Sequence, residues 1–86
     1  MEYVLSKRFE KAFKRLPKPV QKKVVVVLEI FVANPDDPTL RKHHLSGKWS
    51  NHFSVDVTGD VRAVYVYMSD DIVHFVAVGS HSELYG

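Results

Sequence analysis

The sequence has no cysteine, one tryptophan, and no apolar run that approaches the roughly 20 residues needed to span a bilayer. The absence of cysteine excludes disulfide bonds and thiolate metal sites. The opening segment Met1–Leu5 has neither the basic nor the long apolar part of a secretory signal. We therefore expect a soluble, cytoplasmic protein without a membrane partner.

Length and composition allow one small folded domain. The chain has 86 residues, of which 45% are hydrophobic and 26% are charged. These fractions are ordinary for globular proteins and unlike those of disordered segments. No internal repeat or long linker divides the chain, so we expect residues 1–86 to form a single domain.

Charge is distributed unevenly along the chain. Residues 1–48 hold 11 of the 12 Lys and Arg residues and five of the ten acidic ones, whereas residues 49–86 hold Arg62 against the other five. The first half therefore carries +6 and the second −4. A basic half favours an anionic partner such as nucleic acid, although a solvated helix surface has the same composition.

Two helices are expected in the basic half. Ser6 can cap a helix that begins at Lys7, and Pro17 and Pro19 end it and start the next, because proline suits a first turn but not an interior. The segment Val20–Ala33 includes four consecutive valines, which favour a strand, but its length of about fifteen residues favours a helix. Its apolar surface is wider than one stripe, which predicts deep burial or a partner protein.

The acidic half predicts strands. Three segments of strand-like composition follow one another: Phe53–Val57, Val61–Met68 and Ile72–Val78. The short turns between them favour an antiparallel meander, whose edge the short segment Tyr3–Leu5 can join. We therefore predict an α+β fold: two N-terminal helices pack on one face of a small, mainly antiparallel sheet, and the other face stays open.

Several functional motifs are absent. The chain has no glycine-rich phosphate loop, no dinucleotide-binding fingerprint and no H-E-x-x-H pair. Its five histidines do not sit at metal-ligand spacings with carboxylates. We therefore expect neither a metal nor a cofactor.

Polar residues gather instead around the predicted strand ends. His43 precedes the meander, Asp60 and Arg62 lie at its first turn, and His81 and Tyr85 follow its last strand. Strand ends lie side by side in a small sheet, so these side chains can converge. Together they suit RNA cleavage by internal transfer, in which a base takes the 2′-hydroxyl proton, a cation holds the phosphate charge and an acid protonates the 5′ oxygen.

Two of these residues also have structural interpretations. Arg62 can form a salt bridge to Asp60 or Asp56, which contributes little if it is exposed. His81 can be an imidazole in an exposed loop. Trp49 is likewise open to two interpretations, since it can anchor the core or stack on a nucleobase.

Three motifs in one order carry a family resemblance. They are H-x-L-x-G with a following tryptophan at 43–49, G-D-x-R-x-x-Y at 59–65, and G-S-H-S-E-L-Y-G at 79–86. In this order the chain resembles the RelE/ParE toxin superfamily, and most of all its YafQ-like branch of ribosome-dependent mRNA interferases. The resemblance implies a type II toxin that cleaves mRNA in the ribosomal decoding site without a metal and is neutralised by a cognate antitoxin.

The resemblance also implies roles for residues. His43 matches a proton-transfer or phosphate-contact position, and Asp60 matches the acid ahead of the second meander strand. Arg62 resembles the arginine that steadies the scissile phosphate. His81 matches the general acid or base, and Tyr85 takes the place of the C-terminal aromatic that stacks on the nucleotide.

Charged residues near this set complete the interpretation. Arg41, Lys42 and Lys48 are expected to contact RNA. The chain departs from its relatives at Asp56, where some carry histidine or lysine, and at Ala77, where YafQ-like relatives carry arginine. The loss of two cations near the phosphate is expected to weaken catalysis if nothing compensates.

Two other functions fit the same resemblance. One is a ParE-like poison of DNA gyrase without ribonuclease activity, and the other is a catalytically weak relative that only binds an antitoxin. The apolar second helix and the sheet edge are surfaces that an antitoxin segment could cover. We therefore expect the free protein to be less soluble than its complex.

Overall fold

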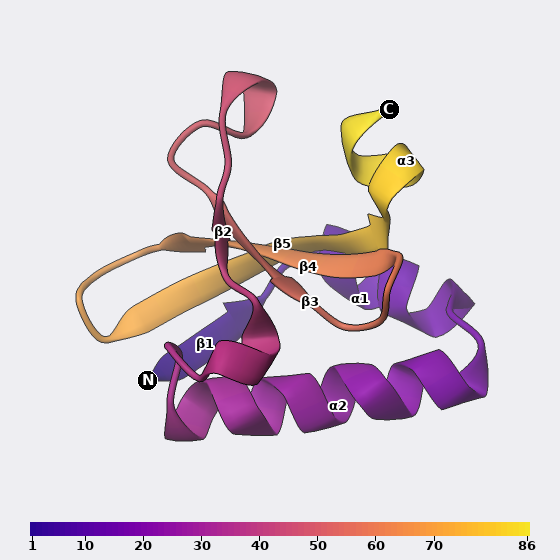
Figure 1. Ribbon diagram of the computed structural model, residues 1–86, viewed down its shortest axis with the longest axis horizontal. Helices are drawn as coiled ribbons and strands as arrows, with labels where there is room; N and C mark the ends of the chain where they lie inside the picture. The colour runs from indigo at the N-terminus through magenta and orange to yellow at the C-terminus, as the bar shows by residue number, and fades with distance from the viewer.

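The computed structural model describes residues 1–86 and consists of a sheet with helices packed on it (Figure 1). The helices α1 (Lys7–Arg15) and α2 (Lys18–Ala33) cover one face of a five-stranded sheet, whose strand order is β1-β5-β4-β3-β2. The strands are β1 (Glu2–Leu5), β2 (His43–His44), β3 (Phe53–Asp56), β4 (Val61–Tyr67) and β5 (Ile72–Ser80). Three short helical segments complete the fold: the 3-10 helices η1 (Pro38–Leu40) and η2 (Gly47–Trp49), and the helix α3 (His81–Tyr85).

Local sequence chemistry explains where the helices α1 and α2 begin. The Ser6 hydroxyl accepts a hydrogen bond from the amide of Phe9 at 2.9 Å and caps α1, as predicted. Pro19 lies in the first turn of α2, where its missing amide hydrogen costs nothing. The prediction of a helix through the valine run is confirmed, since α2 continues to Ala33.

Aromatic rings join the helices to the sheet. Phe9 of α1 and Phe31 of α2 are fully buried against Phe75 of β5, with ring centroids 5.8 and 5.2 Å apart in edge-to-face contacts. Tyr65 of β4 packs on Phe31 at 5.0 Å. Burying each such side chain contributes about 1.5–3 kcal/mol, so this cluster holds the two layers together.

The sheet confirms the predicted meander and adds a strand to it. The pairs β3–β4 and β4–β5 are antiparallel, and β1 joins the edge of β5 in parallel. The unpredicted strand β2 pairs antiparallel with β3, which sets His43 opposite Ser54. A two-residue strand is too short to show a period in the sequence.

The segment after the last strand differs from the expectation. One interpretation of the sequence placed His81 in an exposed loop, but residues 81–85 form α3. This helix and η2 stand on the sheet face opposite α2 (Figure 1). Leu84 of α3 packs on Val64 and Ala77 of that face, so the face that α1 and α2 leave open is partly covered from the C-terminal side.

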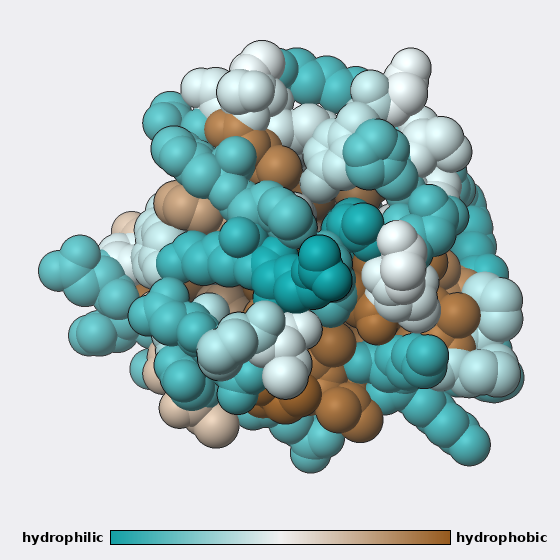
Figure 2. All heavy atoms as spheres, in the orientation of Figure 1, coloured by the Kyte–Doolittle hydropathy of each residue, from teal (hydrophilic) through white to brown (hydrophobic).

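The wide apolar surface of α2 is not explained by burial. Val25, Val26 and Val32 remain exposed, and Figure 2 shows apolar atoms at the surface over α2, along the lower edge of that view. The sequence left two explanations open for this surface, deep burial and a partner protein. Since these valines are not buried, a partner protein is the explanation that remains. As for membranes, α1, α2 and α3 all lack the combination of length and apolar content that a bilayer-spanning helix has.

Candidate active site

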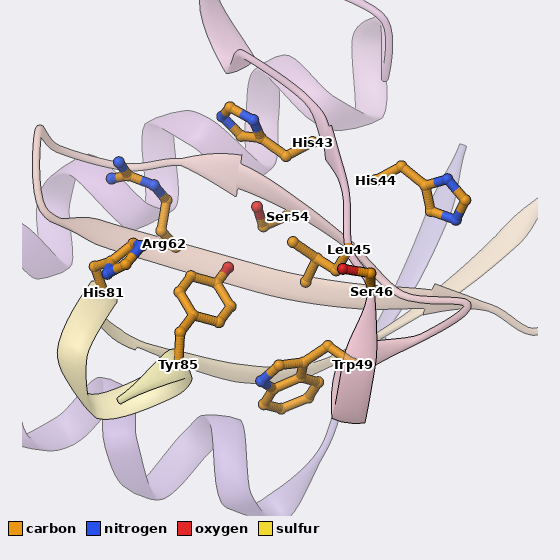
Figure 3. Close-up of a pocket in the computed structure, with 9 residues that line it drawn as sticks. All are labelled: His43, His44, Leu45, Ser46, Trp49, Ser54, Arg62, His81 and Tyr85. Atoms are coloured by element: carbon orange, nitrogen blue, oxygen red, sulfur yellow. The ribbon is translucent and has the colours of Figure 1, made fainter.

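A cleft of about 500 Å³ opens on the sheet face that α1 and α2 do not cover (Figure 3). Strands β3 and β4 form its floor, and the segment from β2 to η2 faces α3 across it. The cleft is lined by His43, His44, Leu45, Ser46, Trp49, Ser54, Arg62, His81 and Tyr85. Four of the five residues that the sequence proposed as catalytic therefore surround one space, although they come from separate parts of the chain.

The helix α3 carries His81 and Tyr85 on one face. The amide of Ser80 donates to Glu83 Oε1 at 2.8 Å, and the amide of Glu83 donates to the Ser80 hydroxyl at 3.2 Å, which makes a capping box. Residues four apart share a helix face. The rings of His81 and Tyr85 accordingly meet edge to face, with centroids 4.8 Å apart.

The capping box also sets the ionisation of Glu83. The hydrogen bond from the Ser80 backbone, and then that from its hydroxyl, hold the pKa of Glu83 below its ordinary value of 4.5. A charged carboxylate is favourable at the N-terminal end of a helix. The cap that begins α3 is therefore a charged one.

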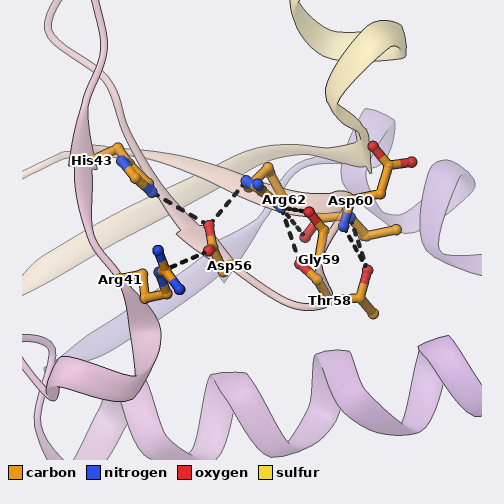
Figure 4. A network of polar contacts seen from close by, with 8 residues as sticks. Arg41, His43, Asp56, Thr58, Gly59, Asp60 and Arg62 are labelled. Atoms are coloured by element: carbon orange, nitrogen blue, oxygen red, sulfur yellow. Dashed lines mark hydrogen bonds and ion pairs between the residues drawn. The ribbon is translucent and has the colours of Figure 1, made fainter.

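Arg62 is anchored on β4 by backbone carbonyls (Figure 4). Its Nη1 donates to the carbonyl oxygens of Thr58, Gly59 and Val61 at 3.0, 3.1 and 3.4 Å. Its Nε lies 2.9 Å from Oδ1 of Asp56. Nη2 makes none of these contacts. The guanidinium is therefore held through Nε and Nη1, while Nη2 can contact a ligand.

Asp56, which the sequence did not assign to the site, lies at the centre of a cluster of basic side chains (Figure 4). Besides Arg62, Nε of Arg41 lies 3.5 Å from Oδ2, and Nε2 of His43 lies 3.5 Å from Oδ1. Oδ1 is buried and accepts no hydrogen bond, so its contact with Arg62 is an ion pair by distance. Of the two partners that the sequence offered Arg62, the register selects Asp56, because these residues are opposite each other on β3 and β4.

The adjacent residues His43 and His44 point in different directions (Figure 3). Successive side chains on a strand alternate between its two faces. His43 reaches toward Asp56, whereas the ring of His44 stacks on Phe53 with centroids 4.9 Å apart. His43 is therefore the imidazole of β2 that belongs to the polar cluster.

Asp60 lies at the turn before β4 and does not line the cleft. Its carboxylate is exposed, and its backbone carbonyl accepts a hydrogen bond from the amide of His81 at 3.0 Å. Asp60 is thus connected to the site through the main chain.

The expected RNA-contacting residues lie beside the cleft and differ in the exposure and the contacts of their side chains. The side chain of Arg41 is 73% exposed. Lys42 is tied to Asp36 at 3.3 Å and lies over the ring of Phe53, 5.1 Å from its centroid. Lys48 is exposed on η2.

Two buried hydroxyl groups lack partners in the structure. They belong to Tyr85, which lines the cleft, and to Tyr65, which lies in the core. Burial raises the pKa of the Tyr65 phenol well above its ordinary value. Buried polar groups are nearly always hydrogen-bonded, so the Tyr85 hydroxyl, which is shielded from solvent beside the cleft, is an exception.

The chain matches a known family of proteins over its whole length. The family model for the bacterial toxin YafQ of type II toxin–antitoxin systems matches residues 1–86. The chain is similar to the crystal structure of YafQ from E. coli strain BL21(DE3), with a TM-score of 0.83 and 21% identity over 99% of this chain and 98% of that chain. No curated protein matches the sequence.

Two further solved structures are similar. One is a copper-bound mutant toxin from Helicobacter pylori, with a TM-score of 0.69 and 31% identity over 99% of each chain. The other is in the E. coli DinJ–YafQ toxin–antitoxin complex, with a TM-score of 0.71 and 22% identity over 99% of this chain and 97% of that chain. The family match covers all three motifs and every residue of the cleft, so the chain belongs to the YafQ family of bacterial toxins from type II toxin–antitoxin systems.

Proposed function

We propose that this toxin is an endoribonuclease that cleaves mRNA in the decoding site of the ribosome, in the cytoplasm and without a metal ion. One observation supports the proposal most: two imidazoles, a guanidinium and a phenol ring, from His43, His81, Arg62 and Tyr85, line a single cleft. Its volume of about 500 Å³ is in the range of sites that bind small molecules or one unit of a polymer.

The proposed reaction is internal transfer to the 2′-oxygen of the RNA. One imidazole takes the proton of the 2′-hydroxyl, and the oxygen attacks the adjacent phosphorus. The bond from phosphorus to the 5′ oxygen breaks as the other imidazole donates a proton to that oxygen. The products are a 2′,3′-cyclic phosphate and a 5′-hydroxyl, and His43 and His81 are the two proton carriers because imidazole titrates near neutral pH.

Arg62 would stabilise the charge that develops on the phosphate. Its carbonyl partners and Asp56 hold the guanidinium in place before the substrate arrives. A donor fixed in advance does not have to reorganise during the reaction, which is why such groups contribute strongly to catalysis. The uncommitted Nη2 is the atom that would contact the phosphate.

Tyr85 and Asp60 complete the proposed set. The ring of Tyr85, which lines the cleft, would stack on a nucleobase. Asp60 would contribute through its carbonyl, which accepts from the amide of His81 at 3.0 Å and so ties the turn before β4 to α3.

Positive residues outside the cleft would bind the RNA backbone. Arg41, Lys42 and Lys48 lie next to β2 and η2, where they would contact phosphates of mRNA or ribosomal RNA. The cation that relatives carry at the position of Ala77 has no counterpart on β5, since Ala77 is buried against Val64 and Leu84. In the proposal, Arg62 and Arg41 compensate for that loss.

A cognate antitoxin is the proposed protein partner. A similar structure is a toxin–antitoxin complex, and the exposed valines of α2 offer an apolar surface for such a chain. Covering Val25, Val26 and Val32 would account for apolar residues that the fold itself leaves in contact with water.

The test uses purified translating ribosomes with a defined mRNA. We expect the wild-type toxin to cut the mRNA and leave a 2′,3′-cyclic phosphate, and a 2′-deoxy nucleotide at the cut position to abolish cleavage there. His81→Ala and Arg62→Ala should cut slowly, while Arg15→Ala on the far end of α1 should cut normally. Uncut mRNA together with inhibited DNA gyrase would overturn the proposal in favour of a gyrase poison.

A further inference from the structure

The helix α3 is too short to be stable by itself. It has five residues, whereas isolated helices shorter than about 12–15 residues are marginal in water. The last carbonyl groups of a helix also lack partners within it. Something outside α3 must therefore hold it, since it carries two residues of the proposed active site.

Trp49 supplies such a contact from across the cleft. Its indole Nε1 donates a hydrogen bond to the carbonyl oxygen of Leu84 at 2.9 Å. Its ring packs on the buried group formed by Val64, Ala77 and Leu84. The carbonyl of Leu84 directly precedes Tyr85, so the bond fixes the backbone from which the Tyr85 ring extends.

The indole ring is itself held in place from a third element. The guanidinium of Arg8 on α1 lies over it, 5.5 Å from the ring centroid, in a cation–π contact. His52 meets it edge to face at 5.4 Å. Arg8 thus covers one face of the Trp49 ring, so a nucleobase cannot readily stack on that face.

We propose that Trp49 is a positioning residue of the active site, acting through the Leu84 carbonyl to fix α3 and with it Tyr85 and His81. It joins η2, α1 and α3, which the sequence separates by more than thirty residues. Catalytic groups must be held within a fraction of an ångström of their working geometry, and displacements of about 1 Å can cost about 100-fold in rate. The inference rests on the proposed function only in the experiments that measure mRNA cleavage.

The chain offers a direct probe, because Trp49 is its only tryptophan. In ¹⁵N-labelled wild-type protein the single indole N–H signal should exchange with solvent at least about tenfold more slowly than that of free tryptophan, as a bonded donor does. Exchange as fast as in free tryptophan would overturn the inference without any variant or activity assay.

The variant Trp49→Phe keeps an aromatic ring and removes the donor. We expect the fold to be retained, the nuclear Overhauser contact between the rings of His81 and Tyr85 to weaken, and the Gly86 amide, which bonds to Ser82, to exchange about 5–30-fold faster. In the ribosome assay, kcat should fall by about tenfold or more with a smaller change in KM. The matched control Tyr67→Phe likewise keeps a ring and removes a donor, at an exposed position outside the cleft, and should leave the ring contact intact.

Two results separate this inference from the proposed function. An unchanged ring contact and unchanged Gly86 exchange in folded Trp49→Phe would overturn the positioning role, even if the wild type cleaves mRNA. If the wild type does not cleave, the proposed function fails, while the exchange and ring measurements still decide whether Trp49 holds α3. If Trp49→Phe does not fold, the exchange of the wild-type indole decides alone.

Discussion

Asp56 and Arg62 are opposite each other on β3 and β4, with Oδ1 of the first 2.9 Å from Nε of the second. The pair is mostly buried, at 16% and 17% side-chain exposure. The cation of the cleft is therefore paired with an anion before any substrate binds, and the carbonyls around Nη1 add to its restraint. The consequences of this pairing can be tested by replacing Arg62 or by replacing Asp56.

Replacing Arg62 should impair cleavage whatever the substitute. We expect Arg62→Ala to lower the single-turnover cleavage rate by about 100-fold, the usual effect of removing a donor that stabilises a developing oxyanion. Arg62→Lys should not restore activity, because one ammonium cannot contact the carbonyls, the carboxylate and a phosphate at once. The rate is measured with saturating toxin on programmed ribosomes.

A matched control for this series is Arg15→Lys, which makes the same chemical change on α1. It should cleave at the wild-type rate. An Arg62→Lys variant within about threefold of the wild type would show that a point charge is enough, and would contradict the role given to the guanidinium fork.

Removing the charge of Asp56 should change stability and RNA binding in opposite directions. We expect Asp56→Asn to lower the free energy of unfolding in urea by about 1–2 kcal/mol, since desolvation offsets much of the attraction and Arg62 keeps its carbonyl partners. The same change removes a negative charge beside the proposed phosphate site, so RNA should bind more tightly. Asp70→Asn, in an exposed turn, should change neither quantity.

A stable Asp56→Asn variant that binds RNA more weakly would contradict this account of the cluster. It would mean that Asp56 contacts the RNA itself, as a base or through a bridging group. Binding is measured by titration of a labelled single-stranded RNA at fixed salt, because salt alone shifts such affinities strongly.

The order of the elements could be predicted because each has a strong local signal. Ser6, Pro17 and Pro19 mark helix ends by their backbone chemistry, and the valine run was resolved by length. The strands followed from alternation and short turns. These signals depend on neighbouring residues alone, so one sequence is enough to read them.

The site needed information that local patterns do not contain. Asp56 and Asp60 are equally good partners for Arg62 by spacing, and only the register of β3 against β4 decides between them. The strand β2 has two residues and no period. The helix α3 did have a readable signal, the Ser80 and Glu83 capping box, which the closing motif contained.

The cap of α3 should lose its strength in acid. The pKa of Glu83 is lowered in the folded protein, so its carboxylate contributes stability that is complete above the ordinary value of 4.5 and is lost as the pH falls through the lowered value. Between about pH 6 and pH 2, the Ser80 amide should shift in NMR spectra as the hydrogen bond from it to Glu83 breaks.

The variant Glu83→Gln isolates this effect. Glutamine also completes a capping box but does not titrate, so the Ser80 amide should shift much less over the same range. The wild-type and Gln spectra should therefore diverge only at acidic pH. Identical titrations of the two proteins would contradict the charged cap.

The exposed valines of α2 should affect solubility more than stability. Val26 is 52% exposed, so Val26→Lys should change the free energy of unfolding by no more than about 0.5 kcal/mol. It should raise the solubility of the free toxin and weaken binding of its antitoxin. The buried neighbour Val24, at 0% exposure, provides the contrast, since Val24→Ala should cost about 2 kcal/mol.

Solubility is measured as the saturating concentration of purified toxin, and antitoxin binding by calorimetry. A Val26→Lys toxin that binds its antitoxin as tightly as the wild type would place the antitoxin elsewhere. Low solubility in both proteins would show that the valine surface does not drive self-association.

The central claim is that the cleft cleaves mRNA, and mapping the 5′ ends of cellular mRNA after induction tests it most directly. The account predicts new 5′-hydroxyl ends inside coding sequences with the wild-type toxin, and their near absence with His81→Ala expressed to the same level. Growth arrest by both proteins with intact transcripts, or the same new ends with both, would contradict it.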